Sequence, residues 1–275
     1  MDAVKIGIAA EPGEGKSTVA LFPDEPDQKV LLIATNAVAA KLRGIPRSWI
    51  DGRVTVELAG FNTSGQRETG GSYYKKMMGY AAKPRPEFTR IVVDDITTMV
   101  RCHYNDILLP MGGLPSEYRR ENEAPQQFGF AFMEQIWQAN TGAQIIALHH
   151  TKKINRPGAD KVLDTHWFEL VGSKLDDSWA GRFDGFFFMD SILAKDNKNP
   201  RLMTVRRRLH LTPGGVWKFV INRHGLGEPT FPAMVDVTVN SEKDTQPLKN
   251  AWLAMDAATG GDVSMSIPSE EKENA

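Results

Sequence analysis

The sequence predicts an α/β fold in which a mostly parallel central sheet has helices on both faces and a late antiparallel hairpin extends one side. Three observations predict it. A strand-like run at residues 4–9 leads through a glycine-bearing loop into a helix-compatible segment. Further apolar runs alternate with helix-compatible segments, which is typical of buried parallel strands joined by crossover helices. Two late strand-like runs flank Pro213-Gly214-Gly215 and predict the hairpin.

The loop after the first strand has the pattern of a phosphate-binding P-loop. Gly13 and Gly15 allow the backbone to curl so that N–H groups point at phosphate oxygens, and the next helix adds its positive end. Lys16 would reach the β and γ phosphates, and the Ser17 hydroxyl would bind Mg²⁺. Ala10 stands where the motif has its first glycine, and the alternative is a chance match in a glycine-rich loop. The predicted nucleotide-binding residues are Glu11, Pro12, Gly13, Glu14, Gly15, Lys16, Ser17 and Thr18.

The first half of the chain alternates helices with strands. Residues 16–22 are helix-compatible and end at a Pro-rich turn. The run at 29–34 is apolar and bounded by polar residues, as expected of a strand buried on both faces. The further predictions are a short helix at 37–43, a strand at 54–58, a loop at 61–71 and a helix at 72–82.

The second half continues this alternation. The apolar run at 90–95 ends in two acids, and a helix through Leu109 and a Gly/Pro-rich connection at 110–125 follow it. Residues 126–140 place apolar side chains at helical spacing, and the buried strand at 144–148 ends in two histidines. The remaining predictions are a polar loop at 154–168, a short helix within 172–181, strands at 183–189, 202–209 and 216–222, and a helix at 246–257.

Composition indicates a protein with a buried core and no disulfide framework. The chain has 275 residues, 41% apolar and 24% charged, with Cys102 as its one cysteine. We find no signal peptide and no apolar run of membrane-spanning length, so we expect a cytoplasmic protein without membrane contact. Residues 1–240 are expected to form the main domain, and residues 241–275 a C-terminal helix with an acidic, disordered tail.

The net charge is −1, so the chain as a whole is not basic, but its charges are unevenly distributed. Residues 201–227 hold six Lys or Arg and no acid, whereas residues 241–275 hold seven acids and three lysines. This distribution fits a polyanionic partner with a tail that competes for the same surface. It fits a solvated strand face and an ordinary terminus equally well.

Two predicted strands end in residues that suit phosphate chemistry. Asp94 is placed to hold Mg²⁺ opposite Ser17, while Asp95 would orient or deprotonate the attacking water. Alternatively, one or both acids cap the next helix. His149 and His150 end the following strand, where polar groups would meet the γ-phosphate. Adjacent histidines point to opposite faces of a strand, so they are a poor pair for chelating a metal.

The triplet Arg206-Arg207-Arg208 lies within a predicted strand. Alternation places Arg206 and Arg208 on one face. Two guanidinium groups on one face could act as arginine fingers for a neighbouring subunit's γ-phosphate, or bind a phosphodiester backbone. A charged, solvated edge strand explains the same pattern.

These residues resemble the RecA-like ATPase superfamily. The P-loop, the strand Ile91-Val92-Val93-Asp94-Asp95 and the run Ile145 to Lys152 are similar to phage-encoded core-only RecA-like recombination ATPases and plasmid hexameric helicases. Those proteins have a similar His-His-Thr-x-Lys strand end and a Gly-Ser segment before the next strand, as at Gly172-Ser173. The segment Lys218 to Gly225 is similar to their closing strand and basic turn, so the resemblance spans about residues 4–235.

The resemblance implies a RecA-like P-loop fold, ATP and Mg²⁺ as cofactors, and a ring or filament of identical subunits with ATP between them. His150 would sense the γ-phosphate, and Arg206 and Arg208 would complete a neighbour's site. Loops near 110–125 and 154–168 would face single-stranded DNA. The sequence departs from the family at Asn36, where Ala34-Thr35-Asn36 stands in place of the usual catalytic glutamate.

We therefore expect an ATPase that acts on single-stranded DNA in phage recombination or replication, in the host cytoplasm, with a single-strand-binding protein as a further partner. The catalytic residues would be Lys16, Asp95, His150, Arg206 and Arg208, with Ser17 and Asp94 as metal ligands. One alternative is a P-loop kinase of a small molecule or nucleotide, although the polar segment Asn155 to Asp164 lacks the arginines of a typical kinase lid. The other is a nucleotide-gated assembly or packaging component with little turnover, which Asn36 favours.

Overall fold

A computed structural model of the 275-residue chain describes residues 3–35, 42, 44–61, 66, 70–103, 118–155, 164–168, 177–195, 201–213, 220, 222 and 231–260. Statements about the structure below refer to these residues.

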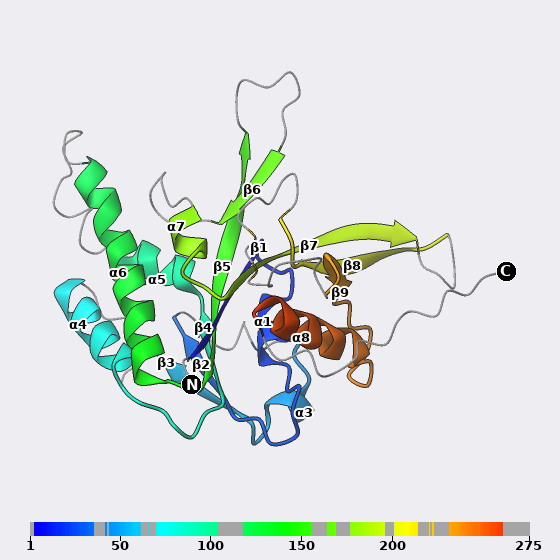
Figure 1. Ribbon diagram of the computed structural model, residues 1–275, viewed down its shortest axis with the longest axis horizontal. Helices are drawn as coiled ribbons and strands as arrows, with labels where there is room; N and C mark the ends of the chain where they lie inside the picture. Colours follow the sequence, from blue (N-terminus) through cyan, green and yellow to red (C-terminus); the bar gives the residue numbers. More distant parts are fainter. Residues whose placement is uncertain are drawn as a thin grey trace.

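The described strands form one sheet in the order β3-β2-β4-β5-β1-β7-β8-β9, with β6 paired to the far end of β5 (Figure 1). The pairs from β3 to β7 in this order are parallel. The pairs β7–β8, β8–β9 and β5–β6 are antiparallel. The predicted fold class is thereby confirmed. The strands are β1 (Val4–Ala10), β2 (Val30–Ala34), β3 (Val54–Leu58), β4 (Arg90–Asp94), β5 (Gln144–Asn155), β6 (Asp164–Phe168), β7 (Gly185–Lys195), β8 (Met203–His210) and β9 (Met234–Asp236).

Helices cover both faces of the sheet, as Figure 1 shows. Helices α4, α5 and α6 contact one another on one face, whereas α1 and α8 lie together on the other. This arrangement buries central strands on both faces, which explains their continuous apolar runs. The helices are α1 (Lys16–Leu21), α3 (Arg47–Ile50), α4 (Gly70–Ala81), α5 (Ile96–His103), α6 (Tyr118–Ala139), α7 (Asp177–Ala180) and α8 (Gln246–Ala258).

The C-terminal helix α8 is packed into the main core. Leu248, Ala251, Trp252 and Met255 are buried within the same hydrophobic cluster as β1 and β2. The Trp252 indole also donates a hydrogen bond to a carbonyl of α1, over 3.1 Å. Helix α8 therefore supports the helix that follows the P-loop.

Two expected irregular segments contain regular structure. The prediction of an irregular connection at 110–125 is wrong in part, because α6 begins at Tyr118 and continues through Pro125. Residues 118–124 are mostly Arg, Glu, Asn and Ala, and the Arg, Glu and Ala among them favour a helix. Pro125 is the eighth residue of α6, where it removes one backbone donor from the helix.

The prediction of a polar loop at 154–168 is also wrong in part. Strand β5 runs on to Asn155 and pairs with β6, so that Thr151 lies opposite Phe168 and Asn155 opposite Asp164. Thr, Trp and Phe in β6 favour an extended backbone, and the antiparallel pair satisfies backbone groups without a hydrophobic pattern.

Strand β8 pairs with β7 along its whole length. Most of the predicted hairpin partner at 216–222, with most of its turn, lies outside the described residues. So do Asn36, Gly172, Ser173, most of the helix predicted at 37–43 and the tail from residue 261.

Candidate functional site

A cavity of about 860 Å³ lies at the carboxyl ends of the central strands. The P-loop and the start of α1 form one wall, and Asp94, Asp95 and His150 lie in the lining. These groups meet because β4, β5 and β1 are neighbours in the sheet, with His150 opposite Ala10 in the parallel register. Ligands bind at this end of parallel sheets, so the cavity is the candidate site.

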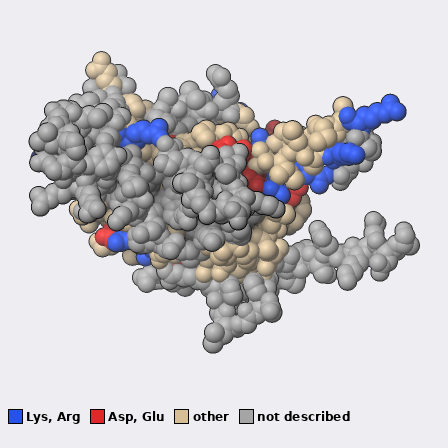
Figure 2. Space-filling model, turned by 90° about the horizontal axis from the view of Figure 1, so that it is seen from above, with Lys and Arg blue, Asp and Glu red and all other residues tan. Residues whose placement is uncertain are grey.

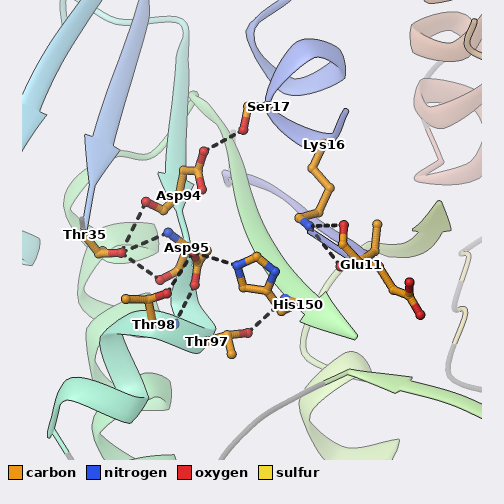
Figure 3. Close-up of polar contacts among 10 residues, drawn as sticks. Glu11, Lys16, Ser17, Thr35, Asp94, Asp95, Thr97, Thr98 and His150 are labelled. Carbon is orange, nitrogen blue, oxygen red and sulfur yellow. Dashed lines mark hydrogen bonds and ion pairs between the residues drawn. The ribbon is translucent and has the colours of Figure 1, made fainter. Parts of the chain in front are cut away.

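The P-loop has the backbone that its glycines permit. Gly13 and Gly15 have φ of 89° and 88°, in the left-handed region that favours glycine. Ala10 needs no such freedom because it is still the last residue of β1, and this explains why alanine is accepted there. The Lys16 ammonium donates hydrogen bonds to the carbonyls of Ala10 (2.9 Å) and Glu11 (3.1 Å), as Figure 3 shows.

The remaining loop residues divide into two groups. Pro12, Ser17 and Thr18 line the cavity with Lys16 and the two glycines. The Glu14 carboxylate instead accepts a hydrogen bond of 3.0 Å from the Ser191 hydroxyl on β7. Glu11 contributes its backbone carbonyl to Lys16, and its side chain is not part of the lining.

Ser17 and Asp94 converge on one point. The Ser17 hydroxyl donates a hydrogen bond of 2.7 Å to Asp94 Oδ2, and the Asp94 side chain is buried (Figure 3). A hydroxyl and a carboxylate are hard oxygen ligands of the kind that Mg²⁺ accepts together with phosphate and water. The pair therefore fits a Mg²⁺ ion that is shared with a bound nucleotide.

Both carboxylate oxygens of Asp95 accept hydrogen bonds. Oδ1 accepts the Thr98 backbone N–H (2.5 Å), and Oδ2 accepts the Thr98 hydroxyl (3.0 Å), so Asp95 caps α5. His150 Nε2 lies 3.1 Å from the same Oδ2. The Thr35 hydroxyl accepts the Asp95 N–H, and the Thr97 hydroxyl accepts the His150 N–H, both over 3.0 Å. These contacts hold the His150 ring at the cavity (Figure 3).

His149 is a core residue. Its ring is fully buried, Nε2 accepts a hydrogen bond of 2.9 Å from the Trp179 indole, and Nδ1 lies 3.1 Å from the Ala147 carbonyl. Burial among aromatic rings lowers the pKa of His149 to about 3, with the Ala147 carbonyl opposing the shift. The ring is therefore neutral, with its proton on Nδ1. In the described part of the chain, no three His, Cys, Asp or Glu residues are grouped as metal ligands.

This burial predicts an acid-sensitive fold. The pKa of His149 is lower in the folded state than its ordinary value of about 6.5, so protons bind preferentially to the unfolded chain between about pH 6.5 and 3. The free energy of unfolding should therefore fall by about 2 kcal/mol between pH 7 and pH 5 because of His149. Urea unfolding at both pH values would test this, with His149→Gln as the comparison, since it removes this group's share of the pH dependence. Equal pH dependence in both proteins contradicts the prediction.

The three arginines of β8 lie differently from one another. Arg208 Nε and Nη2 form a bidentate pair with the Asp190 carboxylate on β7, at 2.8 and 2.6 Å. Burial acts to raise the pKa of Asp190, but hydrogen bonds from His210 and Arg208 outweigh it and lower the value to about 2. Arg206 lies on the same face as Arg208, opposite Ile192. Neither lines the cavity, whereas Arg207, which has the opposite orientation, does.

The wall opposite the P-loop comes from segments that the sequence analysis left unassigned. Pro46 and Trp49 of the α3 region form part of it, and Val237, Val239 and residues 240–242 after β9 form the rest. A hydrogen bond from the Ser48 hydroxyl to the Glu242 carboxylate joins the two segments. This wall offers apolar surface to a ligand whose phosphates occupy the loop. No local sequence signal marks it.

Comparisons with known proteins give little further information. No protein-family profile matches the sequence, and no curated protein matches it. A prototypical ATPase from the type III secretion system of pathogenic bacteria has 15% identity and a TM-score of 0.36 over 69% of this chain. The match spans about half of that ATPase, 52% of its length. A biliverdin reductase from Synechocystis has 10% identity and a TM-score of 0.19, over 75% of this chain and 68% of its own.

Among the described helices, none combines the length and the apolar character needed to cross a membrane.

Proposed function

We propose that this protein is a RecA-like P-loop ATPase that acts on single-stranded DNA in recombination or replication, as phage-encoded core-only members of that superfamily do. The observation that carries the proposal is the hydrogen bond from Ser17 to Asp94 beside Lys16. A P-loop hydroxyl and a strand-end carboxylate meet at one point, next to an ammonium group. This combination suits a nucleoside triphosphate with its metal ion.

Ser17 and Asp94 would hold Mg²⁺, which neutralises phosphate charge when it is bound. Lys16 would exchange the carbonyls of Ala10 and Glu11 for phosphate oxygens, which are stronger acceptors because they are charged.

The contacts of His150 suit a phosphate sensor. Its Nδ1 is buried at the cavity and has no hydrogen-bond partner among the described residues. Because Nε2 is held 3.1 Å from Asp95 Oδ2, Nδ1 is the ring nitrogen that is left to contact a terminal phosphate. In this proposal Asp95 orients His150. The alternative role of Asp95 is to deprotonate the attacking water.

Two projecting hairpins, β5–β6 and β7–β8, support the proposal that the protein binds a polyanion. The register of β5 and β6 pairs Lys152 with Trp167 and Lys153 with His166, a mixture of cations and aromatic rings that suits stacked bases and phosphates. Lys195 and Arg201 are exposed at the end of the β7–β8 hairpin, and Figure 2 shows Lys and Arg side chains gathered at the far end of this arm. We therefore propose single-stranded DNA as the partner, with a single-strand-binding protein as a possible companion.

The projecting β7–β8 hairpin also supports the proposal that the protein forms a homo-oligomer. Leu193 and Val205 form a cross-strand pair and are 68% and 47% exposed, and Met203 on the same face is 56% exposed. Apolar side chains gathered on a projecting arm favour contact with another protein surface. In a ring or filament, a second copy would cover this surface, and Arg206 would reach toward a neighbour's nucleotide.

A nucleotide-gated assembly component with little turnover is the second candidate. The observation that favours it is Asp95, whose carboxylate oxygens already accept hydrogen bonds from Thr98 and contact His150. A carboxylate committed in this way is a weak general base.

Steady-state ATP hydrolysis with Mg²⁺ tests the proposal, with and without single-stranded DNA, at about 50 and 200 mM salt. We expect DNA to stimulate hydrolysis and the stimulation to fall steeply at the higher salt, because phosphate contacts release counterions. Heparin serves as a control polyanion that has no bases to stack. Hydrolysis that DNA leaves unchanged at both salts contradicts the DNA partner, and ATP binding without turnover in every condition favours the assembly component.

A further inference from the structure

We propose that Arg207 binds the phosphates of the nucleotide held by its own subunit, an inference that rests on the proposed ATP site. Arg206 and Arg208, the residues expected to act as fingers for a neighbouring site, lie on the other face of β8. Arg207 has a different environment, and three independent observations define it.

The first contact is with the P-loop itself. Arg207 Cδ lies 3.3 Å from the position that a Cβ on Gly15 would occupy, so the side chain runs directly over the loop. Arg207 lines the same cavity as Lys16 and Ser17. The stem of the side chain therefore passes within van der Waals distance of the residue that precedes the phosphate-binding lysine, in the same chain.

The second contact fixes the backbone of Arg207. Its N–H donates to the Thr238 hydroxyl over 2.8 Å, and its carbonyl accepts the Val237 N–H over 2.9 Å. Directly across the hairpin, Ser191 is bonded to Glu14 of the P-loop. The segment after β9 thus holds the backbone of Arg207, and Ser191 ties the paired strand β7 to the P-loop, which limits how far Arg207 can move away from the loop.

The third observation concerns the guanidinium. Nε of Arg207 is buried and has no hydrogen-bond partner among the described residues. A buried donor without an acceptor is costly, and it differs sharply from the bidentate pairing of Arg208 with Asp190. A phosphate oxygen in the cavity would satisfy this donor. A planar guanidinium is suited to phosphate because it can donate two parallel hydrogen bonds.

The test measures binding of the fluorescent analogues mant-ATP and mant-ADP to wild type and to Arg207→Gln. Both proteins are studied at a concentration where sedimentation shows a monomer and at a hundred-fold higher one. We expect Arg207→Gln to bind mant-ATP about 10- to 100-fold more weakly than wild type, by the same factor at both concentrations. Arg207→Lys should recover part of the affinity. A greater loss for mant-ATP than for mant-ADP assigns Arg207 to the terminal phosphate, and equal losses assign it to the inner ones.

Arg47→Gln is the matched control, because it removes the same charge from a side chain that is 88% exposed and should bind like wild type. Wild-type affinity in a folded Arg207→Gln protein overturns the inference. So does a loss that appears only at the concentration where subunits assemble, because Arg207 would then serve a neighbour. If Lys16→Ala also binds mant-ATP normally, the proposed ATP site itself fails. If Lys16→Ala loses binding and Arg207→Gln does not, only the role of Arg207 fails.

Discussion

Lys16→Ala is expected to lower the affinity for ATP by about 100-fold or more while the fold stays intact. The ammonium donates to the carbonyls of Ala10 and Glu11 at the cavity, where a triphosphate would offer charged acceptors in their place. Charge-assisted hydrogen bonds to phosphate are among the stronger polar contacts in proteins. The Ala10 carbonyl does not depend on Lys16 for its position, because Ala10 belongs to β1. We expect the free energy of unfolding to change by less than about 1 kcal/mol.

Titration with a fluorescent ATP analogue and urea unfolding of the same samples would check both halves of this prediction. Lys75→Ala is a suitable control, since Lys75 is exposed on α4, far along the chain from the P-loop. The control should bind like wild type. Wild-type affinity in Lys16→Ala would mean that the P-loop is not the phosphate site.

The part of the site that could be predicted lies at strand ends. Asp94 and His150 each follow a continuous apolar run, and such runs predict parallel strands buried on both faces. The carboxyl ends of parallel strands lie at one edge of a sheet, so their polar residues are expected to lie near the P-loop. The structure brings them there because β5 lies between β4 and β1.

The part that could not be predicted depends on pairing between distant segments. Alternation along β8 separates Arg207 from Arg206 and Arg208, but it does not tell which face meets the P-loop. That depends on β7 lying beside β1 and on the register of β7 with β8. The wall formed by Trp49 and Val239 likewise arises from packing of segments far apart in sequence, which no local pattern records.

Asp95 illustrates how one residue type serves two purposes. Its position after an apolar strand is equally typical of a catalytic acid and of a helix cap. The hydrogen bonds from Thr98 place it at the start of α5, and the contact with His150 joins that cap to the cavity. The cap is local and is one of the alternatives that the sequence predicts, whereas the contact with His150 could not be inferred, because it depends on the orientation of α5 relative to β5.

Arg90 joins the sheet to the helices beneath the site. It is the first residue of β4, its side chain is fully buried, and its guanidinium donates to the Phe22 carbonyl (2.7 Å) and to Gln144 Oε1 (2.6 Å). An ion pair with Asp24 and a position 3.7 Å above the Trp252 ring complete its surroundings. Burial lowers the pKa of Arg90 to about 10, against the raising effect of Asp24, so the group remains charged at neutral pH.

Arg90→Met is therefore expected to lower the free energy of unfolding by about 3–5 kcal/mol, because it leaves the Asp24 charge without its partner and buried acceptors unsatisfied. Arg90→Lys should lose less, since it keeps the charge but cannot donate to Gln144 and Phe22 at once. Urea unfolding would measure both, with Arg47→Met as a control at an exposed position that should change stability by less than about 0.5 kcal/mol. A loss below about 1 kcal/mol for Arg90→Met would mean that the buried contacts of Arg90 do not hold α1 and α8 to the sheet. Because α1 begins at Lys16, the same variant should also weaken ATP binding before the chain unfolds.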